Sequence, residues 1–198
     1  MMIEWKPKKD IWFPMGLKER IIQTAIALFA DSGLKFTMQD IAGEMHIAKK
    51  TIYHEFESKE DLLLAMLEKG FSEIQKEKQK ITGSDLPLPE KLKRVMIALP
   101  EEYSVLDFRQ LEGLKEKYPL AAEELKKHLE NNWEPVIRII REGQEAGVFR
   151  NISIPVLRVM VTASIESFLS GGILKEEKIP YETALDEMMM IIMKGIEA

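Results

Sequence analysis

The most constraining feature of the sequence is the segment from Thr37 to Leu62, which holds two short amphipathic patterns with almost no chain between them. Apolar residues recur at helical spacing in both halves: Met38, Ile41, Ala42 and Met45 in the first, and Ala48, Ile52 and Phe56 in the second. Each set gives one helix face that must be covered. Because so few residues separate the sets, the segment predicts two helices joined by a tight turn, which is the geometry of a helix-turn-helix.

The starts of two helices are marked by capping residues. Thr37 precedes the first apolar set and has Asp40 three residues later, which resembles a capping box with Asp in place of Glu. Ser58 and Asp61 have the same spacing and predict the start of a third helix. This helix should continue to about residue 80, with the charged run of residues 73–80 exposed to solvent.

The outward face of the second helix carries groups of the kind that bind nucleic acid. Residues 49–54 supply two cations, a hydroxyl, a phenol and an imidazole, and no acid. Such groups contact phosphate oxygens and base edges when a recognition helix lies in the major groove. Lys59, in the first turn of the next helix, either contacts a phosphate above the helix N-terminus or is a solvated surface lysine.

The stretch from Arg20 to Leu67 resembles the DNA-binding domain of the TetR (tetracycline-repressor-like) family. The matching features are Ala25-x-x-Leu28-Phe29, Gly33, Thr37, Asp40-Ile41-Ala42, Thr51-x-Tyr53-x-x-Phe56 and Lys59-x-x-Leu62, which cover about a quarter of the chain. The DNA-binding residues that we expect are Thr37, Lys49, Lys50, Thr51, Tyr53, His54 and Lys59. Three positions depart from the family pattern: His46 replaces the usual turn Gly, Ala48 the usual Ser or Thr cap, and Lys50 the usual Gly. Lys50 is therefore a candidate for reading a guanine edge.

Composition narrows the possible functions. The chain has 198 residues, no cysteine and three histidines, so neither a disulfide framework nor a cysteine or histidine metal cluster is expected. Apolar residues make up 45% of the chain, but no apolar run is long enough for a membrane span and no signal peptide is present, which predicts a cytoplasmic protein without a membrane. We find no phosphate-binding glycine loop and no nucleophile elbow, and expect neither an enzyme nor a cofactor.

The net charge of −5 is unevenly distributed. Residues 1–82 hold 13 basic and 13 acidic residues, so the acidic excess lies in the second half. A local basic cluster on a neutral unit is compatible with DNA binding. Residues 1–15 combine three lysines with Trp5, Trp12 and Phe13 and predict either a basic arm on DNA or, the favoured alternative, a tail with buried aromatic side chains.

The remaining chain predicts an all-α protein. A first helix should span residues 17–32 and end at Gly33, and a break should occur at residues 82–89. Further helices are expected at residues 90–99, 103–117, 120–146 with a kink at Pro135, 154–170 and 180–196. We expect an N-terminal extension (1–15), a helix-turn-helix DNA-binding domain (16–62) and a helical effector-binding and dimerisation domain (63–198), connected by a long helix.

The second half should contain an effector pocket, because the TetR resemblance implies a small-molecule ligand. Candidate lining residues are Met96, Tyr103, Phe108, Trp133, Ile137 and Glu166. Glu166 is the only charged residue between Val159 and Leu174, and it predicts a pocket carboxylate, a polar group in a subunit interface or a solvent-facing side chain. Most of the twelve methionines are expected in the core, although Met also lines adaptable cavities.

The last two helices favour a homodimer. Residues 188–193 are apolar all round, so the final helix should be covered on more than one side, and we expect residues 155–170 and 180–196 to pair with their copies. The resulting prediction is a sequence-specific transcriptional regulator, favoured as a repressor, that binds palindromic operator DNA and is released by a small-molecule effector. The alternative is a helical small-molecule-binding protein with a degenerate DNA-binding unit.

Overall fold

The computed structural model describes residues 15–100, 103, 108–111, 113–170 and 172–198. Within these residues the chain is helical, apart from an isolated antiparallel bridge between Phe149 and Glu197. The α-helices are α1 (Leu17–Ser32), α2 (Met38–Met45), α3 (Lys49–Glu55), α4 (Lys59–Thr82), α5 (Leu88–Met96), α6 (Leu114–Lys117), α7 (Pro119–Asn131), α8 (Glu134–Glu145), α9 (Ile154–Leu169), α10 (Gly172–Glu176) and α11 (Tyr181–Ile196). Short 3-10 helices cover Gly33–Lys35 (η2) and Phe108–Leu111 (η4). The predicted all-α class is confirmed.

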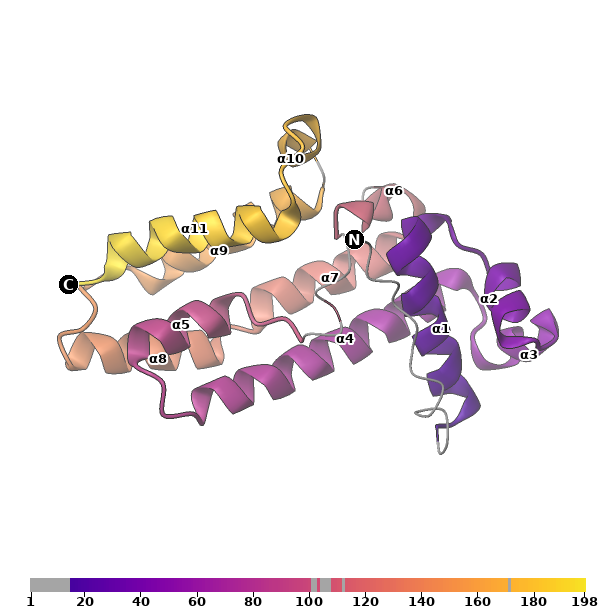
Figure 1. Ribbon diagram of the computed structural model, residues 1–198, viewed down its shortest axis with the longest axis horizontal. Helices are drawn as coiled ribbons and strands as arrows, with labels where there is room; N and C mark the ends of the chain where they lie inside the picture. Colours follow the sequence, from indigo (N-terminus) through magenta and orange to yellow (C-terminus); the bar gives the residue numbers. More distant parts are fainter. Residues whose placement is uncertain (1–14, 101–102, 104–107, 112, 171) are drawn as a thin grey trace, which may run out of the picture.

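Helices α1, α2 and α3 form a three-helix unit at one end of the elongated molecule (Figure 1). The predicted capping box begins α2: Thr37 Oγ1 accepts a hydrogen bond from the Asp40 N–H at 3.2 Å, and the Thr37 N–H donates to Asp40 Oδ2 at 2.8 Å. These bonds satisfy donors that a helix N-terminus otherwise leaves unpaired. The start of α2 is therefore encoded locally, by two residues.

The turn between α2 and α3 depends on His46. This residue adopts a left-handed conformation (φ 54°, ψ 41°), and its N–H bonds to carbonyls of the last turn of α2. His tolerates this conformation better than branched residues do, so it replaces the usual glycine at moderate cost. Ala48 then starts α3 without a side-chain cap. The helix-turn-helix geometry is retained despite both departures.

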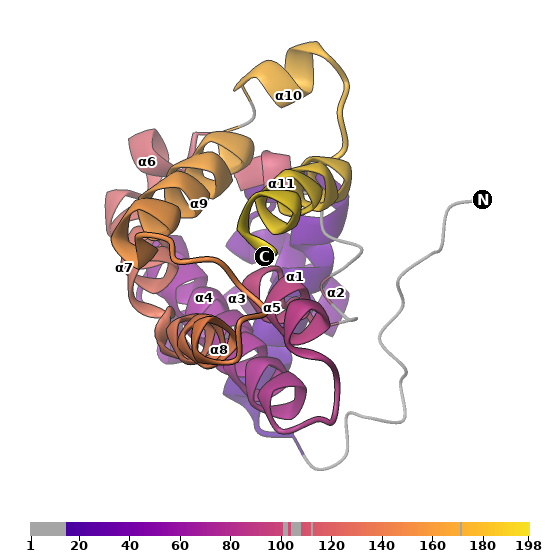
Figure 2. The same ribbon diagram turned by 90° about the vertical axis from the view of Figure 1, so that its left-hand side faces the viewer.

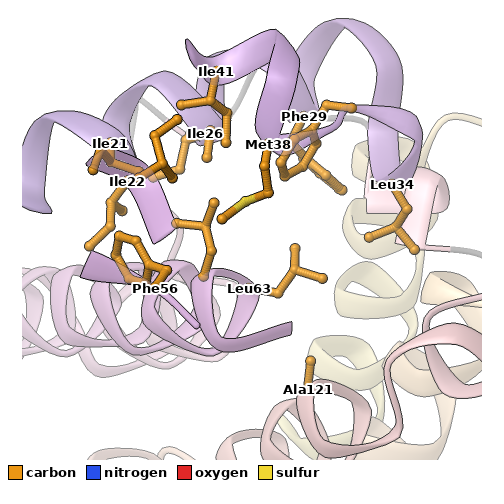
Figure 3. Packing of buried hydrophobic residues seen from close by; sticks show 14 of the residues in the cluster. Ile21, Ile22, Ile26, Phe29, Leu34, Met38, Ile41, Phe56, Leu63 and Ala121 are labelled. Carbon is orange, nitrogen blue, oxygen red and sulfur yellow. The ribbon is translucent and has the colours of Figure 1, made fainter. Parts of the chain in front are cut away.

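One buried cluster fills the space between the three-helix unit and the first half of α4 (Figure 3). Its members come from α1, α2, α3 and α4 and include Ile21, Phe29, Ile41, Phe56 and Leu62. The cluster also takes in Tyr103, Leu114 and Ala121, which follow in the chain after α5. The packing therefore crosses the domain boundary predicted after residue 62, and that boundary stays a proposal.

Helix α4 runs from the three-helix unit into the helical body, where it lies beside α7 and α5 (Figures 1 and 2). A second buried cluster joins α5, α8, α9 and α11 and is centred on Leu92, Ile140, Val161 and Met189. Short α10 stands away from this body in both views. No helix in the described part of the chain is long and apolar enough to cross a membrane.

The region of residues 103–146 differs from the prediction. Instead of one long helix kinked at Pro135, the chain forms α7 and α8, with Asn132 and Trp133 between them. Pro135 lies in the first turn of α8, where its missing N–H would have no helical partner, so it favours a helix start over a kink. The helix expected at 103–117 is replaced, in its described residues, by η4 and α6, and α10 was not predicted.

Candidate DNA-binding surface and ligand cavity

The outward face of α3 presents most of the predicted DNA-binding residues to solvent. Lys49, Lys50, Tyr53 and His54 are exposed, with Tyr53 at 45% of its full accessibility. Ile52 faces the opposite way and is fully buried, which fixes the rotation of the helix. Lys49 Nζ lies 5.6 Å from the centre of the Tyr53 ring, so the cation and the phenol occupy neighbouring positions on one surface.

The two predicted threonines are placed differently. Thr51 is half-buried in α3, whereas Thr37 is exposed but uses its hydroxyl in the capping box, 2.9 Å from Asp40 Oδ2. The backbone at Thr37 still marks the N-terminal end of α2, which adjoins the recognition helix. The DNA contacts predicted for both residues remain predictions.

Lys59 is engaged by the protein itself. Its ammonium donates to the carbonyls of Leu34, at 2.7 Å, and Phe36, and it lies 4.1 Å from the centre of the Phe36 ring. The ring of Tyr118 is 5.4 Å away on another side. Burial lowers the pKa of Lys59, and the positive charge of Lys117 lowers it further, partly offset by Asp40. These contacts tie the start of α4 to the segment between α1 and α2; the predicted phosphate contact stays a prediction.

Glu60, the next residue, connects the same end of α4 to α7. Its Oε1 accepts a hydrogen bond from the Leu120 N–H at 2.8 Å and lies 3.4 Å from the Ala121 N. A carboxylate at a helix N-terminus meets unpaired N–H donors and the positive end of the helix dipole. Adjacent residues of α4 thus hold two different elements, one in the DNA-binding unit and one in the helical body.

A cavity of about 220 Å³ lies between α4, α5, α7, α8, α9 and α11 and reaches α1. Its wall is mainly apolar and runs along α4 from Leu63 through Leu67, Phe71 and Ile74 to Lys78. At the α1 end, Ile26 and Phe29 contribute both to the cavity wall and to the core of the DNA-binding unit. Mostly apolar walls with a few polar groups are typical of small-molecule sites.

The polar groups in the wall come from different helices. Lys78 Nζ donates to the Asn132 carbonyl at 3.1 Å, and burial lowers the pKa of Lys78 to about 8. His128 stacks on the Phe71 ring at 4.2 Å and places Nε2 3.5 Å from a Glu124 carboxylate oxygen. Tyr181 lines the wall from the start of α11, where burial raises the pKa of its hydroxyl.

The structure brings three of the six predicted pocket residues into this wall, namely Met96, Tyr103 and Trp133. Ile137 and Glu166 are half-buried and are not among the described lining residues. Each follows a residue that does line the cavity, Val136 and Ile165, and one helical step of about 100° turns the next side chain away from it. The side chain of Phe108 lies outside the described residues.

Lys78 lines the cavity, although the sequence pattern predicts that it is exposed to solvent. The charged run around it predicts an exposed face, but its side chain is only 8% exposed. The available signal is its spacing: Phe71, Ile74 and Lys78 recur at i, i+3 and i+7, so the lysine continues an apolar stripe. A charged residue on such a stripe indicates a buried polar site.

A third surface lies on α9 and α11, which run side by side (Figures 1 and 2). Large apolar side chains are more than half exposed on both helices: Val156, Val159 and Met160 on α9, and Met190 and Ile191 on α11. Met189 and Met193, by contrast, are buried against the body. Several large exposed apolar side chains on two neighbouring helices are the kind of surface found at protein interfaces.

Comparison with known proteins agrees with this geometry. Residues 21–66 match the family model described as bacterial regulatory proteins of the tetR family. The chain is 25% identical over 183 residues to YvaF, an uncharacterized HTH-type transcriptional regulator of Bacillus subtilis (strain 168), covering 92% of this chain and 96% of that protein. A crystal structure of the transcriptional regulator FadR from Bacillus subtilis in complex with stearoyl-CoA superimposes with a TM-score of 0.62 at 19% identity, covering 90% of this chain and 99% of that one. Residues 21–66 therefore form a DNA-binding unit of the TetR type, and the chain as a whole resembles HTH-type transcriptional regulators.

Proposed function

We propose that the protein is a homodimeric repressor that binds palindromic operator DNA through α3 and is released when an apolar small molecule enters the cavity. The observation that carries this proposal is the continuity of α4, which begins beside the recognition helix and forms one wall of the cavity. A ligand that changes the position of α4 therefore has a direct effect on the DNA-binding unit. We assign residues 16–62 to DNA binding and residues 63–198 to effector binding and dimerisation.

The exposed side chains of α3 are assigned two different roles in DNA binding, phosphate contact and base readout. Lys49, Tyr53 and His54 are exposed and suited to phosphate contact, whereas Lys50 is the candidate for base readout. Replacing Lys49 with Ala should weaken binding to all sequences, while Lys50→Ala should also relax the preference at one base position. An unchanged preferred sequence for Lys50→Ala would contradict its assignment to base readout.

Dimerisation would cover the apolar surface of α9 and α11. A helix-turn-helix protein needs two copies to read two half-sites about one helical turn apart, and the exposed side chains of these helices supply the contact area. Charged substitutions at Val159 and Ile191, which are 67% and 68% exposed, should produce monomers without disturbing the monomer core. Sedimentation of the wild-type chain as a monomer at micromolar concentration would contradict the proposal.

The release mechanism follows from which residues the cavity shares with the DNA-binding unit. Ile26 and Phe29 of α1 and Leu63 of α4 belong both to the cavity wall and to the first core cluster. A ligand that presses on these side chains favours a different packing of α1 against α4, and with it a different separation of the two recognition helices. The ligand acts only through its different affinities for the two arrangements.

The proposal is tested by selecting bound sequences from random duplex DNA at two salt concentrations. Enrichment of a palindrome, with affinity that falls steeply as salt rises, is the expected result, because phosphate neutralisation releases counterions. Absence of enrichment at both salt concentrations would overturn the DNA-binding assignment and favour a small-molecule binder with a degenerate helix-turn-helix. A Lys49→Ala, Lys50→Ala double variant serves as the matched loss-of-binding control.

A further inference from the structure

The cavity contains an ammonium group for which the described residues provide no acidic partner. Lys78 is 8% exposed, and its one hydrogen bond goes to the neutral carbonyl of Asn132 at 3.1 Å. Within the part of the chain that the structure describes, no carboxylate lies within 4.0 Å of Lys78 Nζ. Burying a charge without an opposite charge is costly, and most buried lysines are paired.

Two other lysines of the same helix have ammonium groups that are surrounded by more partners within the protein. Lys69 Nζ lies 2.6 Å from a Glu19 carboxylate oxygen and 2.7 Å from one of Glu73. Lys59 bonds two carbonyls and faces the Phe36 ring. Lys78 is more buried than either and has one neutral acceptor. It lacks both the carboxylate partners of Lys69 and the second carbonyl and aromatic ring that surround Lys59.

The groups around Lys78 need an acceptor from outside. An ammonium has three donor hydrogens, of which the Asn132 carbonyl takes one. The side-chain amide nitrogen of Asn132 is buried and makes no hydrogen bond to any described residue, and the hydroxyl of Thr162 in the same cavity is also buried and unbonded. Two N–H donors of the same cavity wall, the Lys78 ammonium and the Asn132 amide, therefore have unused hydrogens, and an anionic oxygen group is the kind of acceptor that would satisfy them.

The shape of the cavity defines the rest of that partner. From Lys78, the lining follows α4 back to Leu63, a distance of about 22 Å at 1.5 Å per helical residue. The side chains along this path are apolar, apart from the face of His128 stacked on Phe71. The volume of about 220 Å³ lies below the ~300–1,000 Å³ of sites for drug-sized molecules, which suits a narrow chain.

We propose that the effector is a single-chain amphiphile with a terminal carboxylate, bound with that carboxylate on Lys78 Nζ and Asn132 Nδ2. Its alkyl chain lies along α4 and ends against Phe29 and Leu63. This assignment rests on the proposed effector-binding function and specifies its ligand class. The direction matters, because the anionic end is held in the body while the apolar end contacts the core of the DNA-binding unit. Chain length would then decide how strongly a bound molecule affects α1.

The test compares dodecanoate with dodecanol, which has the same chain and no charge, by calorimetric titration of the delipidated full-length protein in the absence of DNA. The wild-type protein should bind dodecanoate about 10- to 100-fold more tightly, the range expected for hydrogen bonds to a charged group. Lys78→Met should lose this preference while still binding dodecanol, which shows that its cavity is intact. Lys76→Met removes the same charge from an exposed position of α4 and should keep the wild-type preference.

Three results would overturn the proposal. Equal affinity of the wild type for dodecanoate and dodecanol would exclude an anion receptor, and an unchanged preference in Lys78→Met would assign the anion to another residue. Binding of dodecanoyl-CoA without binding of dodecanoate would place the required anion on a nucleotide head group instead of a carboxylate. Because no DNA is present, these results are independent of whether operator selection succeeds.

Discussion

The two ends of α4 each carry a lysine that is shielded from solvent, but the two lysines differ in how many partners the protein gives them. At the DNA-binding end, Lys59 is fully engaged by the protein, with two carbonyl acceptors and an aromatic face. At the other end, Lys78 has one carbonyl acceptor and faces a cavity. Burial lowers the pKa of both residues, so both ammonium groups are held where water cannot solvate them well. The difference indicates that Lys59 stabilises the fold, whereas Lys78 is available to a ligand.

The same comparison explains how one helix can serve two functions. The first turn of α4 is fixed by Lys59 to the α1–α2 connection and by Glu60 to the N-terminus of α7. The final turns are instead attached to the body through the Lys78 bond to Asn132 and through apolar packing. A ligand bound at Lys78 would therefore act on one end of a helix whose other end is tied to the DNA-binding unit.

The largest stability effect is expected for Lys59→Met. This variant removes two hydrogen bonds to a charged donor and leaves the Leu34 and Phe36 carbonyls without their partner, at a cost of about 2–4 kcal/mol. Urea unfolding of the purified protein measures the change. A loss below about 0.5 kcal/mol would show that Lys59 is an ordinary surface lysine and would remove the contrast with Lys78.

Lys78, in contrast to Lys59, should destabilise the folded protein, and the size of this effect should depend on pH. Its pKa is about 8 in the folded protein against the usual 10.5, so between these values the unfolded chain binds more protons and the free energy of unfolding rises with pH. The rise attributable to Lys78 is at most about 3 kcal/mol, and below about pH 8 its destabilising effect is fully present.

The measurement is the difference between the wild type and Lys78→Met in urea unfolding across pH 7–10, with ligand removed. Subtraction cancels the contributions of groups that both proteins share, including Tyr181 in the cavity wall and Lys59. At pH 7 the variant should be as stable as the wild type or more stable. Parallel pH curves for the two proteins would contradict the environment assigned to Lys78.

A smaller effect is expected for Glu60→Ala, which leaves the N-terminus of α7 without its carboxylate. Loss of a charged acceptor at helix N–H groups typically costs about 1 kcal/mol. The variant should also weaken the effect of a ligand on DNA affinity, because Glu60 joins α4 to α7. Glu116→Ala, an exposed acid on α6, is the control and should change neither quantity.

The smallest effect is expected for Lys76→Met. Lys76 is exposed on α4 two residues before Lys78, so its removal should change the free energy of unfolding by less than about 0.5 kcal/mol. Ligand preference should also remain that of the wild type. A large effect in either measurement would mean that the effects predicted for Lys78 arise from its position along α4 and not from its burial.

Local signals predicted the DNA-binding unit closely. The helix at residues 17–32, the capping box at Thr37 and the left-handed turn at His46 each depend on a few neighbouring residues, and each is present as expected. The orientation of α3 also followed from sequence, because one buried residue, Ile52, fixes which side chains face outward. Periodicity and capping were sufficient here because the structure is determined within a short segment.

The cavity was predicted poorly because its walls come from distant parts of the chain. Lys78 looked like part of a solvated run, and its burial depends on contact with the end of α7, 54 residues away. Ile137 and Glu166 were candidates for the pocket, Glu166 as one of three alternatives, but neither is among the residues that line the cavity. Pro135 has two common roles, kink and helix start, and only the break at residues 132–133 distinguishes them.

The central claim, that α4 couples the cavity to the DNA-binding surface, is tested most directly by measuring operator affinity at zero and saturating dodecanoate. The account predicts that a saturating ligand weakens operator binding by about 5- to 150-fold in the wild type, the usual range of such coupling. Reciprocally, operator DNA should weaken dodecanoate binding by the same factor. Equal operator affinity with the cavity empty and occupied would contradict the account, even if both ligands bind.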